Sequence, residues 1–295
     1  MSGLYSTIIR LKPESDAVIS PTQGYYTLAL FLNLMRTSNP ELAEKLHDSS
    51  TFKPFTISPL LGSFKSQDKN LKIASNCSYS VRLTFLNEET FCHFLDATLK
   101  TNGIPLRIES AIFLLDSVLV NRSESPLCDY QSYEELMGNA LPERKISLRF
   151  DSITTFRSGG NRNVIFPQPD LILGSYFQKW QHFSPIRFSS DLANCWQSVR
   201  ISRYKLESHI LHFKNYQETG FAGECVLEVD PRLSDEAVKA INTLANFAFF
   251  CGTGAKTTMG MGQTRRIYEY QDQSRDHHCR REYRTAGRPH QPGKA

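Results

Sequence analysis

The order of strand and helix patterns constrains the fold of this chain more than any other feature. Residues that alternate between apolar and polar predict strands, and apolar residues three or four positions apart predict helices. Each half of the chain shows the same order, strand-helix-strand-strand-helix-strand. This is the order of the ferredoxin-like split βαβ unit, which RNA-recognition modules also use. The sequence therefore predicts an α+β fold of tandem ferredoxin-like (RRM-like) βαββαβ domains.

The clearest strand pattern of the first half lies at residues 77–85. Its apolar side chains share one face, and Ser78, Ser80, Arg82 and Thr84 share the other. This pattern predicts a half-buried strand whose polar face meets solvent. The other elements expected in this half are a strand at 5–11, helices at 28–35 and 39–46, a helix at 88–99, and one long strand at 106–120.

The second half contains the best-marked helix. Ser234 is suited to be its N-cap, Asp235 and Glu236 favour its positive end, and Gly252 stops it. The other elements expected here are strands at 146–156, 199–213, 221–229 and 263–270, and a helix around 173–180. We therefore divide the chain into an N-terminal domain at 1–122, a junction at 123–145 with a short helix at 133–137, a C-terminal domain at 146–270, and a disordered basic tail at 271–295.

Composition limits the partners of the chain. Of the net charge of +4 over 295 residues, the tail supplies +3 through six basic and three acidic residues, so a nucleic-acid partner must be argued from a local patch. Seven cysteines without close spacing predict free thiols rather than disulfides or a zinc site. His277, His278 and Cys279 lie in the tail without further ligands at metal-site spacing, so no metal and no cofactor is expected. Without a signal peptide or a membrane-spanning run, we expect a cytoplasmic protein with no membrane partner.

A glycine-rich loop follows the second half's last helix. Glycine permits positive φ and close approach to a ligand, consecutive N–H groups can bind an anion, and a lysine adds a charge suited to phosphate. We interpret the loop as a clamp on a phosphate backbone, and a simple helix stop followed by a hairpin is the alternative. The residues predicted to bind are Gly252, Gly254, Lys256, Gly260, Gly262, Arg265 and Arg266.

Two familiar nucleotide motifs do not fit this loop. In a Walker motif a glycine directly precedes the lysine, but Ala255 stands before Lys256 here. A dinucleotide fingerprint needs a third glycine where the chain has Thr257, and it follows a strand rather than a helix. The loop therefore predicts contact with a phosphate backbone, not a mononucleotide or dinucleotide site.

Further short stretches, taken in order, resemble a known family. They are SNPELAEKLH at 38–47, KPFTIS at 53–58, SITTFR at 152–157, FPQPD at 166–170 and GFAG at 220–223. With the glycine loop and its Gly-Met-Gly ending, they make roughly residues 3–270 similar to the CRISPR-associated repeat-processing endoribonucleases of the repeat-associated mysterious protein superfamily. The resemblance implies tandem ferredoxin-like domains around a cleft. It also implies metal-independent cleavage of precursor CRISPR RNA within each repeat, by attack of a ribose 2′-hydroxyl on the scissile phosphate.

The resemblance also assigns roles to single residues. His47 matches the family's catalytic histidine, and the negative end of a short helix favours its protonated form, which suits a general acid. Lys53 matches a lysine that stabilises charge in the transition state. The family's helix tyrosine falls on Leu32 and cannot be carried over. Tyr26, beside Tyr25, is the candidate in its place, and packing in the core is the alternative for both.

Five basic residues on predicted strands are candidates for binding an RNA stem, and a solvated charged sheet face is the alternative. They are Arg149, Arg157, Arg200, Arg203 and Lys205. Three functions stay open: an endoribonuclease acting on CRISPR repeat RNA, a catalytically silent repeat-RNA-binding subunit of a CRISPR effector complex, and a ferredoxin-like ligand-binding protein. His47 favours the first, and the missing tyrosine favours the second. Association with effector subunits or as a homodimer also stays open.

Overall fold

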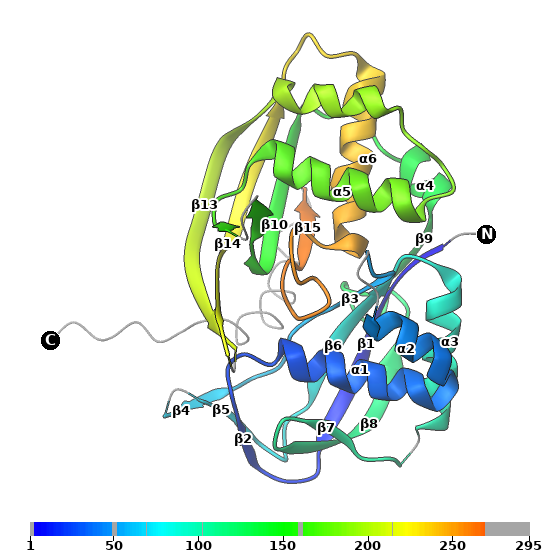
Figure 1. Cartoon of the computed structure of the whole chain (residues 1–295), viewed down its shortest axis with the longest axis vertical. Coiled ribbons are helices and arrows are strands. Elements are labelled where there is room, and N and C mark those ends of the chain that lie inside the picture. Colours follow the sequence, from blue (N-terminus) through cyan, green and yellow to red (C-terminus); the bar gives the residue numbers. More distant parts are fainter. Residues whose placement is uncertain are drawn as a thin grey trace, which may run out of the picture.

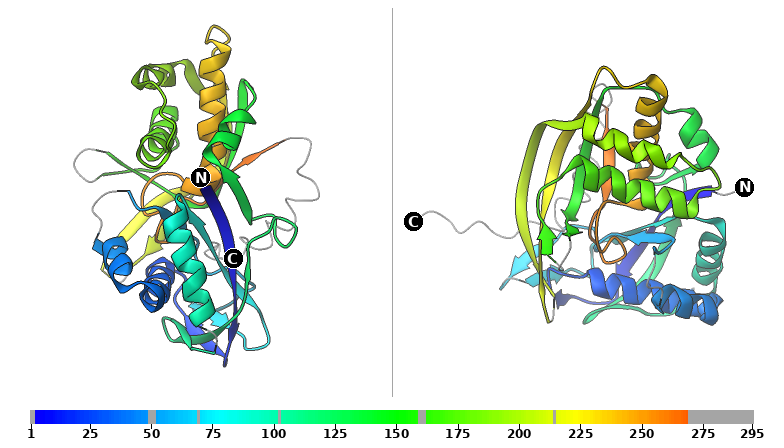
Figure 2. Two further views of the ribbon diagram at one scale, coloured as in Figure 1. Left: turned by 90° about the vertical axis from the view of Figure 1, so that its right-hand side faces the viewer. Right: turned by 45° about the horizontal axis from the view of Figure 1, so that its top comes forward.

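The computed structural model describes residues 3–48, 52–68, 70–101, 103–158, 162–213 and 215–268. Two sheet-and-helix domains are stacked one above the other, the N-terminal one in blue to green below and the C-terminal one in green to orange above (Figure 1). Seen from the side, α1, α2 and α5 all lie on the same side of the molecule (Figure 2). The tail at 271–295, with the His277-His278-Cys279 run for which no metal was expected, lies outside the described residues.

The N-terminal domain has the strand order of a ferredoxin-like sheet. Its elements are β1 (Gly3–Pro13), β2 (Ala17–Ile19), α1 (Gly24–Ser38), α2 (Pro40–Asp48), β3 (Phe55–Ile57), β4 (Lys65–Gln67), β5 (Asn70–Ile73), β6 (Tyr79–Phe85), α3 (Glu88–Lys100), β7 (Leu106–Ile108) and β8 (Ala111–Leu119). The sheet runs β3-β6-β1-β8-β7, with antiparallel neighbours. Asn39 caps α2 as expected, because its Oδ1 accepts the Leu42 N–H at 2.9 Å.

The C-terminal domain repeats this arrangement. Its elements are β10 (Lys145–Thr154), β11 (Phe156–Ser158), β12 (Arg162–Val164), α5 (Pro169–Phe183), a 3₁₀ helix (Ser190–Ser198), β13 (Val199–His212), β14 (Gln217–Val229), α6 (Asp235–Cys251) and β15 (Thr264–Ile267). The sheet order is β13-β14-β10-β15. Ser234 caps α6 by accepting the Ala237 N–H, as predicted. The prediction of two ferredoxin-like units in tandem is confirmed.

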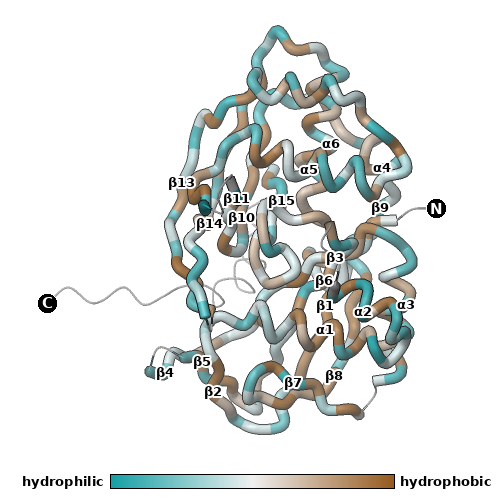
Figure 3. Tube along the Cα trace, viewed as in Figure 1, coloured by the Kyte–Doolittle hydropathy of each residue, from teal (hydrophilic) through white to brown (hydrophobic). Residues whose placement is uncertain are grey.

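The segment between the two domains is more ordered than a junction requires. β9 (Asp129–Ser132) pairs with β1 and so extends the N-terminal sheet. α4 (Tyr133–Gly138) follows, close to the predicted short helix, and Ser132 and Glu135 form a capping box at its start. Each domain has its own hydrophobic core, and hydrophobic residues concentrate along β1, β6 and α6 (Figure 3).

Two sequence expectations about strands were wrong. The long strand expected at 106–120 is a hairpin of β7 and β8, because Glu109 turns the chain with a φ of 55°. The polar face of the strand at 77–85 meets solvent only at its start: Ser78 is exposed and Ser80 is half-buried, whereas Arg82 is 2% exposed and Thr84 is fully buried. The C-terminal end of α6 covers that face, so these polar side chains lie in the interface between the domains.

No helix in the described part of the chain is long and apolar enough to cross a membrane. Within the same residues, no group of three or more His, Cys, Asp or Glu side chains is arranged to hold a metal ion. The six cysteines that the structure describes are free thiols, as the sequence predicts.

Candidate active site

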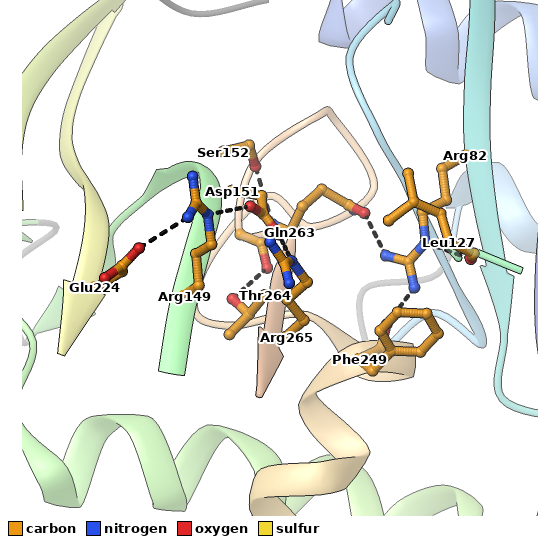
Figure 4. Close-up of polar contacts among 11 residues, drawn as sticks. Arg82, Leu127, Arg149, Asp151, Ser152, Glu224, Phe249, Gln263, Thr264 and Arg265 are labelled. Carbon is orange, nitrogen blue, oxygen red and sulfur yellow. Dashed lines mark hydrogen bonds and ion pairs between the residues drawn. The ribbon is translucent and has the colours of Figure 1, made fainter. Parts of the chain in front are cut away.

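Arg82 joins the two domains at the end of α6. Its guanidinium donates to the Phe249 carbonyl at 2.7 Å, to Gln263 Oε1 at 2.8 Å, to Ser6 Oγ at 2.9 Å and to the Leu127 carbonyl at 3.3 Å (Figure 4). The cation also lies 4.1 Å from the centre of the Phe249 ring. Arg82, a side chain of the N-terminal domain, therefore holds the last turn of α6 and the end of the glycine loop together.

The other carbonyls at this end of α6 are also satisfied by side chains. A helix leaves its last four carbonyls without helical partners. Thr84 donates to the Phe250 carbonyl at 2.5 Å, and Lys179 of α5 donates to the Cys251 carbonyl at 2.6 Å and the Gly252 carbonyl at 3.3 Å. Burial lowers the pKa of Lys179. The start of the glycine loop is thus fixed from both domains.

All four glycines of the loop adopt positive φ, between 63° and 82°. Their N–H groups already donate within the protein, so they do not form an open anion nest. Gly252 donates to the Ala248 carbonyl at 2.9 Å, Gly254 to Ser175 Oγ at 3.3 Å, Gly260 to the Ile57 carbonyl at 3.1 Å and Gly262 to the Ile153 carbonyl at 2.9 Å. The glycines therefore allow close packing within the protein. Any contact between the backbone of the loop and RNA would be made by the loop tip at 256–258.

The loop also connects to the N-terminal domain. The Ile57 N–H in β3 donates to the Thr257 carbonyl at 3.0 Å, which complements the bond from Gly260. On the other side, a Cβ placed on Gly24, the first residue of α1, would lie 1.7 Å from the Met259 carbonyl oxygen. The loop is therefore packed between β3, α1 and its own domain.

His47 and Lys53 are brought together at the end of α2. His47 is exposed in the last turn of the helix. The Lys53 ammonium donates to the Leu46 carbonyl at 2.5 Å and to the His47 carbonyl at 3.0 Å, where a cation complements the helix dipole. Phe52 contacts His182 of α5, with ring centres 5.9 Å apart. Lys53 is followed by β3, which binds the glycine loop, so the histidine helix and the loop share one side of the interdomain region (Figure 2).

The tyrosine candidates differ in exposure. Tyr26 packs against the N-terminal core, and burial, with smaller contributions from Glu109 and Tyr25, raises its pKa. A raised pKa disfavours the phenolate that a general base needs. Leu32 is 5% exposed, whereas the neighbouring Tyr25 is 59% exposed at the start of α1. Of the two tyrosines for which core packing was the alternative, Tyr26 is half-buried against the core, whereas for Tyr25 that alternative is wrong.

Lys256 contacts protein groups at the loop tip. Its Nζ donates to the Tyr216 hydroxyl at 2.7 Å and lies 3.3 Å from Glu218 Oε1. It also lies 4.2 Å from the centre of the Tyr216 ring and 5.2 Å from that of Phe213. The predicted phosphate contact would have to compete with these partners.

Arg265 and Arg266 point to opposite faces of β15, because neighbouring residues in a strand alternate. Arg265 Nε donates to Asp151 at 3.0 Å on the outer face of the sheet. Arg266 lies on the helix face, where it donates to Asn246 of α6 at 3.0 Å and pairs with Glu143. Both predicted RNA-binding arginines therefore have acidic partners within the protein, Asp151 for Arg265 and Glu143 for Arg266.

The other strand arginines are partly paired. Arg149 donates to Asp151 and to Glu224, each at 2.8 Å, and so extends the network of Arg265 across the sheet (Figure 4). Arg200 pairs with Glu228 at 3.0 Å. Arg203 and Lys205 are exposed on β13. Arg200, Arg203 and Lys205 are therefore among the candidate cations that are exposed to solvent.

Comparison with known proteins identifies the family. The model of the CRISPR Cas6 N-terminal domain matches residues 4–138, and the model described as CRISPR-associated endoribonuclease Cas6 matches residues 148–264. The chain belongs to the Cas6 family of CRISPR-associated endoribonucleases. The resemblance inferred from the short sequence stretches is confirmed.

Solved structures and curated relatives agree with this family. A Cas6 product complex is 30% identical, with a TM-score of 0.76 over 90% of this chain and 100% of that chain. Cas6 of Thermus thermophilus is also 30% identical, with a TM-score of 0.70 over 90% of this chain and 99% of that chain. Cas6 of Mycobacterium tuberculosis (strain CDC 1551 / Oshkosh) is 25% identical over 235 residues, 79% of this chain and 68% of that protein.

Sequence reasoning missed several residues of this Cas6-family chain that hold the candidate site together. They are Thr84, Arg82, Lys179, Glu218 and Gln263. Arg82 and Thr84 were noticed, but as solvent-facing residues. The only available signal was an arginine among small polar residues on one face of a strand, which is equally typical of an exposed sheet face.

Proposed function

We propose that this Cas6-family protein is a metal-independent endoribonuclease that cleaves precursor CRISPR RNA within its repeats and so produces guide RNAs in the cytoplasm. The related Cas6 product complex, at 30% identity, supports this proposal. The observation that carries it is the position of His47, exposed at the end of α2, with Lys53 bonded to that helix end and leading into the strand that binds the glycine loop.

In the proposed reaction, the ribose 2′-oxygen attacks the adjacent phosphorus and the bond to the 5′-oxygen of the next nucleotide breaks. The imidazole of His47 donates a proton to that leaving oxygen. The Lys53 ammonium stabilises the negative charge of the pentacoordinate phosphorus. This step leaves a 2′,3′-cyclic phosphate and a 5′-hydroxyl, and subsequent hydrolysis of the cyclic phosphate by water gives a 3′ phosphate.

The proton of the 2′-hydroxyl needs an acceptor, and the tyrosines differ as candidates. Tyr26, our original candidate, is packed against the core with a raised pKa. The exposed Tyr25, at the start of α1 beside the glycine loop, is better placed to contact RNA. A variant that lacks the Tyr25 ring therefore belongs among the experiments that test for the general base.

The alternative proposal is a catalytically silent subunit that binds repeat RNA in an effector complex. The buried Leu32 favours it, because the position of the family's tyrosine carries no proton acceptor. The two proposals predict the same RNA affinity and differ only in cleavage.

His47→Ala is expected to reduce the cleavage rate about 100- to 10,000-fold, because a general acid contributes that much. Labelled repeat RNA is incubated with each protein in excess EDTA, and both products and binding are measured. His93→Ala serves as the matched control, since that histidine lies on α3 and contacts Ser38 and Asn39. It is expected to cleave as the wild type does.

RNA with a 2′-deoxy sugar at the scissile position should bind normally and stay intact. Tight binding without cleavage by the wild type, in EDTA and also after magnesium is added, would establish the silent subunit instead. Cleavage that appears only with magnesium would contradict the metal-independent mechanism.

A further inference from the structure

Lys256 connects the glycine loop to the β13–β14 hairpin. We propose that it is a positioning residue: a tether that fixes the tip of this hairpin against the loop, so that the outer part of the hairpin keeps its place beside the RNA site. The inference rests on the proposed function for its RNA partner. The tether itself is a property of the free protein and can be measured without RNA.

The tip of the hairpin surrounds the lysine. The Phe213 N–H donates to the Tyr216 carbonyl at 2.9 Å, and the two rings stack with centres 4.7 Å apart. The Lys256 ammonium lies over both rings and donates to the Tyr216 hydroxyl. A cation over aromatic faces is attracted by their electron-rich centres. The lysine is therefore held by the turn of the hairpin.

The buried carboxylate of Glu218 also contacts Lys256. The Glu218 side chain is 3% exposed and accepts from Arg157 at 2.6 Å and from Asn163 at 2.8 Å, with Lys256 at 3.3 Å. A carboxylate withdrawn from water is costly unless cations and hydrogen-bond donors compensate it. Glu218 therefore favours Lys256 staying where it is.

This arrangement leaves little of Lys256 for a phosphate. An ammonium has three donors, and Tyr216 and Glu218 already occupy two directions. Only 19% of the side chain is exposed. A phosphate that recruited this lysine would have to displace it from a buried carboxylate, at a cost that an exposed lysine would not have.

The hairpin that Lys256 holds reaches from the C-terminal domain to the N-terminal one (Figure 1). Leu211, near the hairpin tip, lines a cavity of about 40 Å³ with Pro21, Gly24 and Met259. Arg203 and Lys205 lie exposed further along the same strand. Opposite these two cations β14 pairs with β10, so the sheet fixes them, and the contacts of the tip set only where the outer part of the hairpin lies relative to α1 and the loop.

The experiment compares Lys256→Met, Lys256→Arg, Glu218→Gln and the double variant of Lys256→Met with Glu218→Gln. Methionine and arginine both keep the unbranched stem, so any strain at the φ of 56° of residue 256 is the same in both. Hydrogen exchange of the Phe213 amide is measured in the free protein. Binding of repeat RNA, made uncleavable by a 2′-deoxy scissile sugar, is measured over a series of salt concentrations.

We expect Lys256→Met and Glu218→Gln each to speed exchange at the hairpin tip about tenfold, because both release the same contact. Exchange in the double variant should be no faster than in the single ones, since the two residues act as one unit. Lys256→Arg should restore most of the protection. RNA binding should weaken severalfold in both single variants, with the salt slope unchanged, because no phosphate contact is lost.

Unchanged exchange at the hairpin tip in Lys256→Met would overturn the tether. So would a salt slope reduced by about 0.7–0.9 in Lys256→Met alone, which is the signature of one lost phosphate contact. Failure of the proposed function has a different signature. In that case the wild type does not cleave repeat RNA, whether or not it binds it, while the exchange pattern of the free variants still reports on the tether.

Discussion

Arg82→Met is expected to lower the free energy of unfolding by about 3–5 kcal/mol, since each buried acceptor left without a partner costs roughly 1–3 kcal/mol. Methionine fills most of the volume of the arginine side chain, so a cavity contributes little to the expected loss of stability. The lost bonds are those to the carbonyls of Phe249 and Leu127, to Gln263 and to Ser6. Loss of the contact between the cation and the Phe249 ring adds to the effect.

The same substitution should impair cleavage beyond its effect on folding. Arg82 belongs to the N-terminal sheet, while its partners Phe249 and Gln263 flank the glycine loop. Without Arg82, the glycine loop is no longer fixed against the domain that carries His47. Displacement of about 1 Å can cost 100-fold in rate, so we expect roughly a 10- to 100-fold lower single-turnover rate at temperatures where the variant is folded.

Urea unfolding measures the stability effect, with Arg200→Met as the matched control. Arg200 also lies on a strand, but its side chain is 77% exposed and pairs with Glu228 at the surface. Exposed ion pairs are worth about 0–1 kcal/mol, so the control should unfold close to the wild type. If the two arginine variants unfold alike, the buried network does not join the domains in solution.

The fold was predictable because its signals are local. The alternation at 77–85 and the cap at Ser234 depend only on neighbouring residues, and both correspond to observed elements. The turn at Glu109 was missed because a glutamate at positive φ has no sequence signal of the kind that glycine gives. The apolar residues on both sides of Glu109 therefore predicted one continuous strand.

The burial of Arg82 and Thr84 could not be predicted from the same pattern. Alternation shows which side chains share a face of a strand, but not what covers that face. Here the cover is the end of α6, more than 160 residues away along the chain. Polar residues were assigned to solvent because charged side chains are almost never fully buried without partners, and those partners are invisible in the sequence.

The candidate site shows the same limit. His47 and Lys53 came from a family resemblance, and the structure brings them to one helix end. The glycine loop was recognised, but the carbonyls of Ile57 and Ile153 that its N–H groups bind come from distant strands. A list of glycines therefore predicts that a backbone approaches something closely, without saying whether that is RNA or the protein itself.

Gly24→Ala is expected to destabilise the protein by about 2–3 kcal/mol, because overpacking a rigid site costs about 1–3 kcal/mol or more. The new Cβ would lie 1.7 Å from the Met259 carbonyl oxygen, so α1 and the loop must separate. The loop cannot yield easily, since Gly260 and Gly262 are bonded to Ile57 and Ile153. The cleavage rate should fall about 100-fold, as expected for a displacement of about 1 Å.

Gly174→Ala in α5 separates this steric effect from the general effect of alanine in a helix. A Cβ there meets nothing within 4 Å, so the substitution should stabilise the protein by about 0.5–1 kcal/mol through helix propensity. Gly24 is also the first residue of a helix, and propensity alone would predict a gain there too. A Gly24→Ala protein that is more stable than the wild type and cleaves normally would therefore contradict the prediction. It would mean that α1 and the glycine loop are not in contact in solution, and that other contacts position the loop relative to the histidine helix.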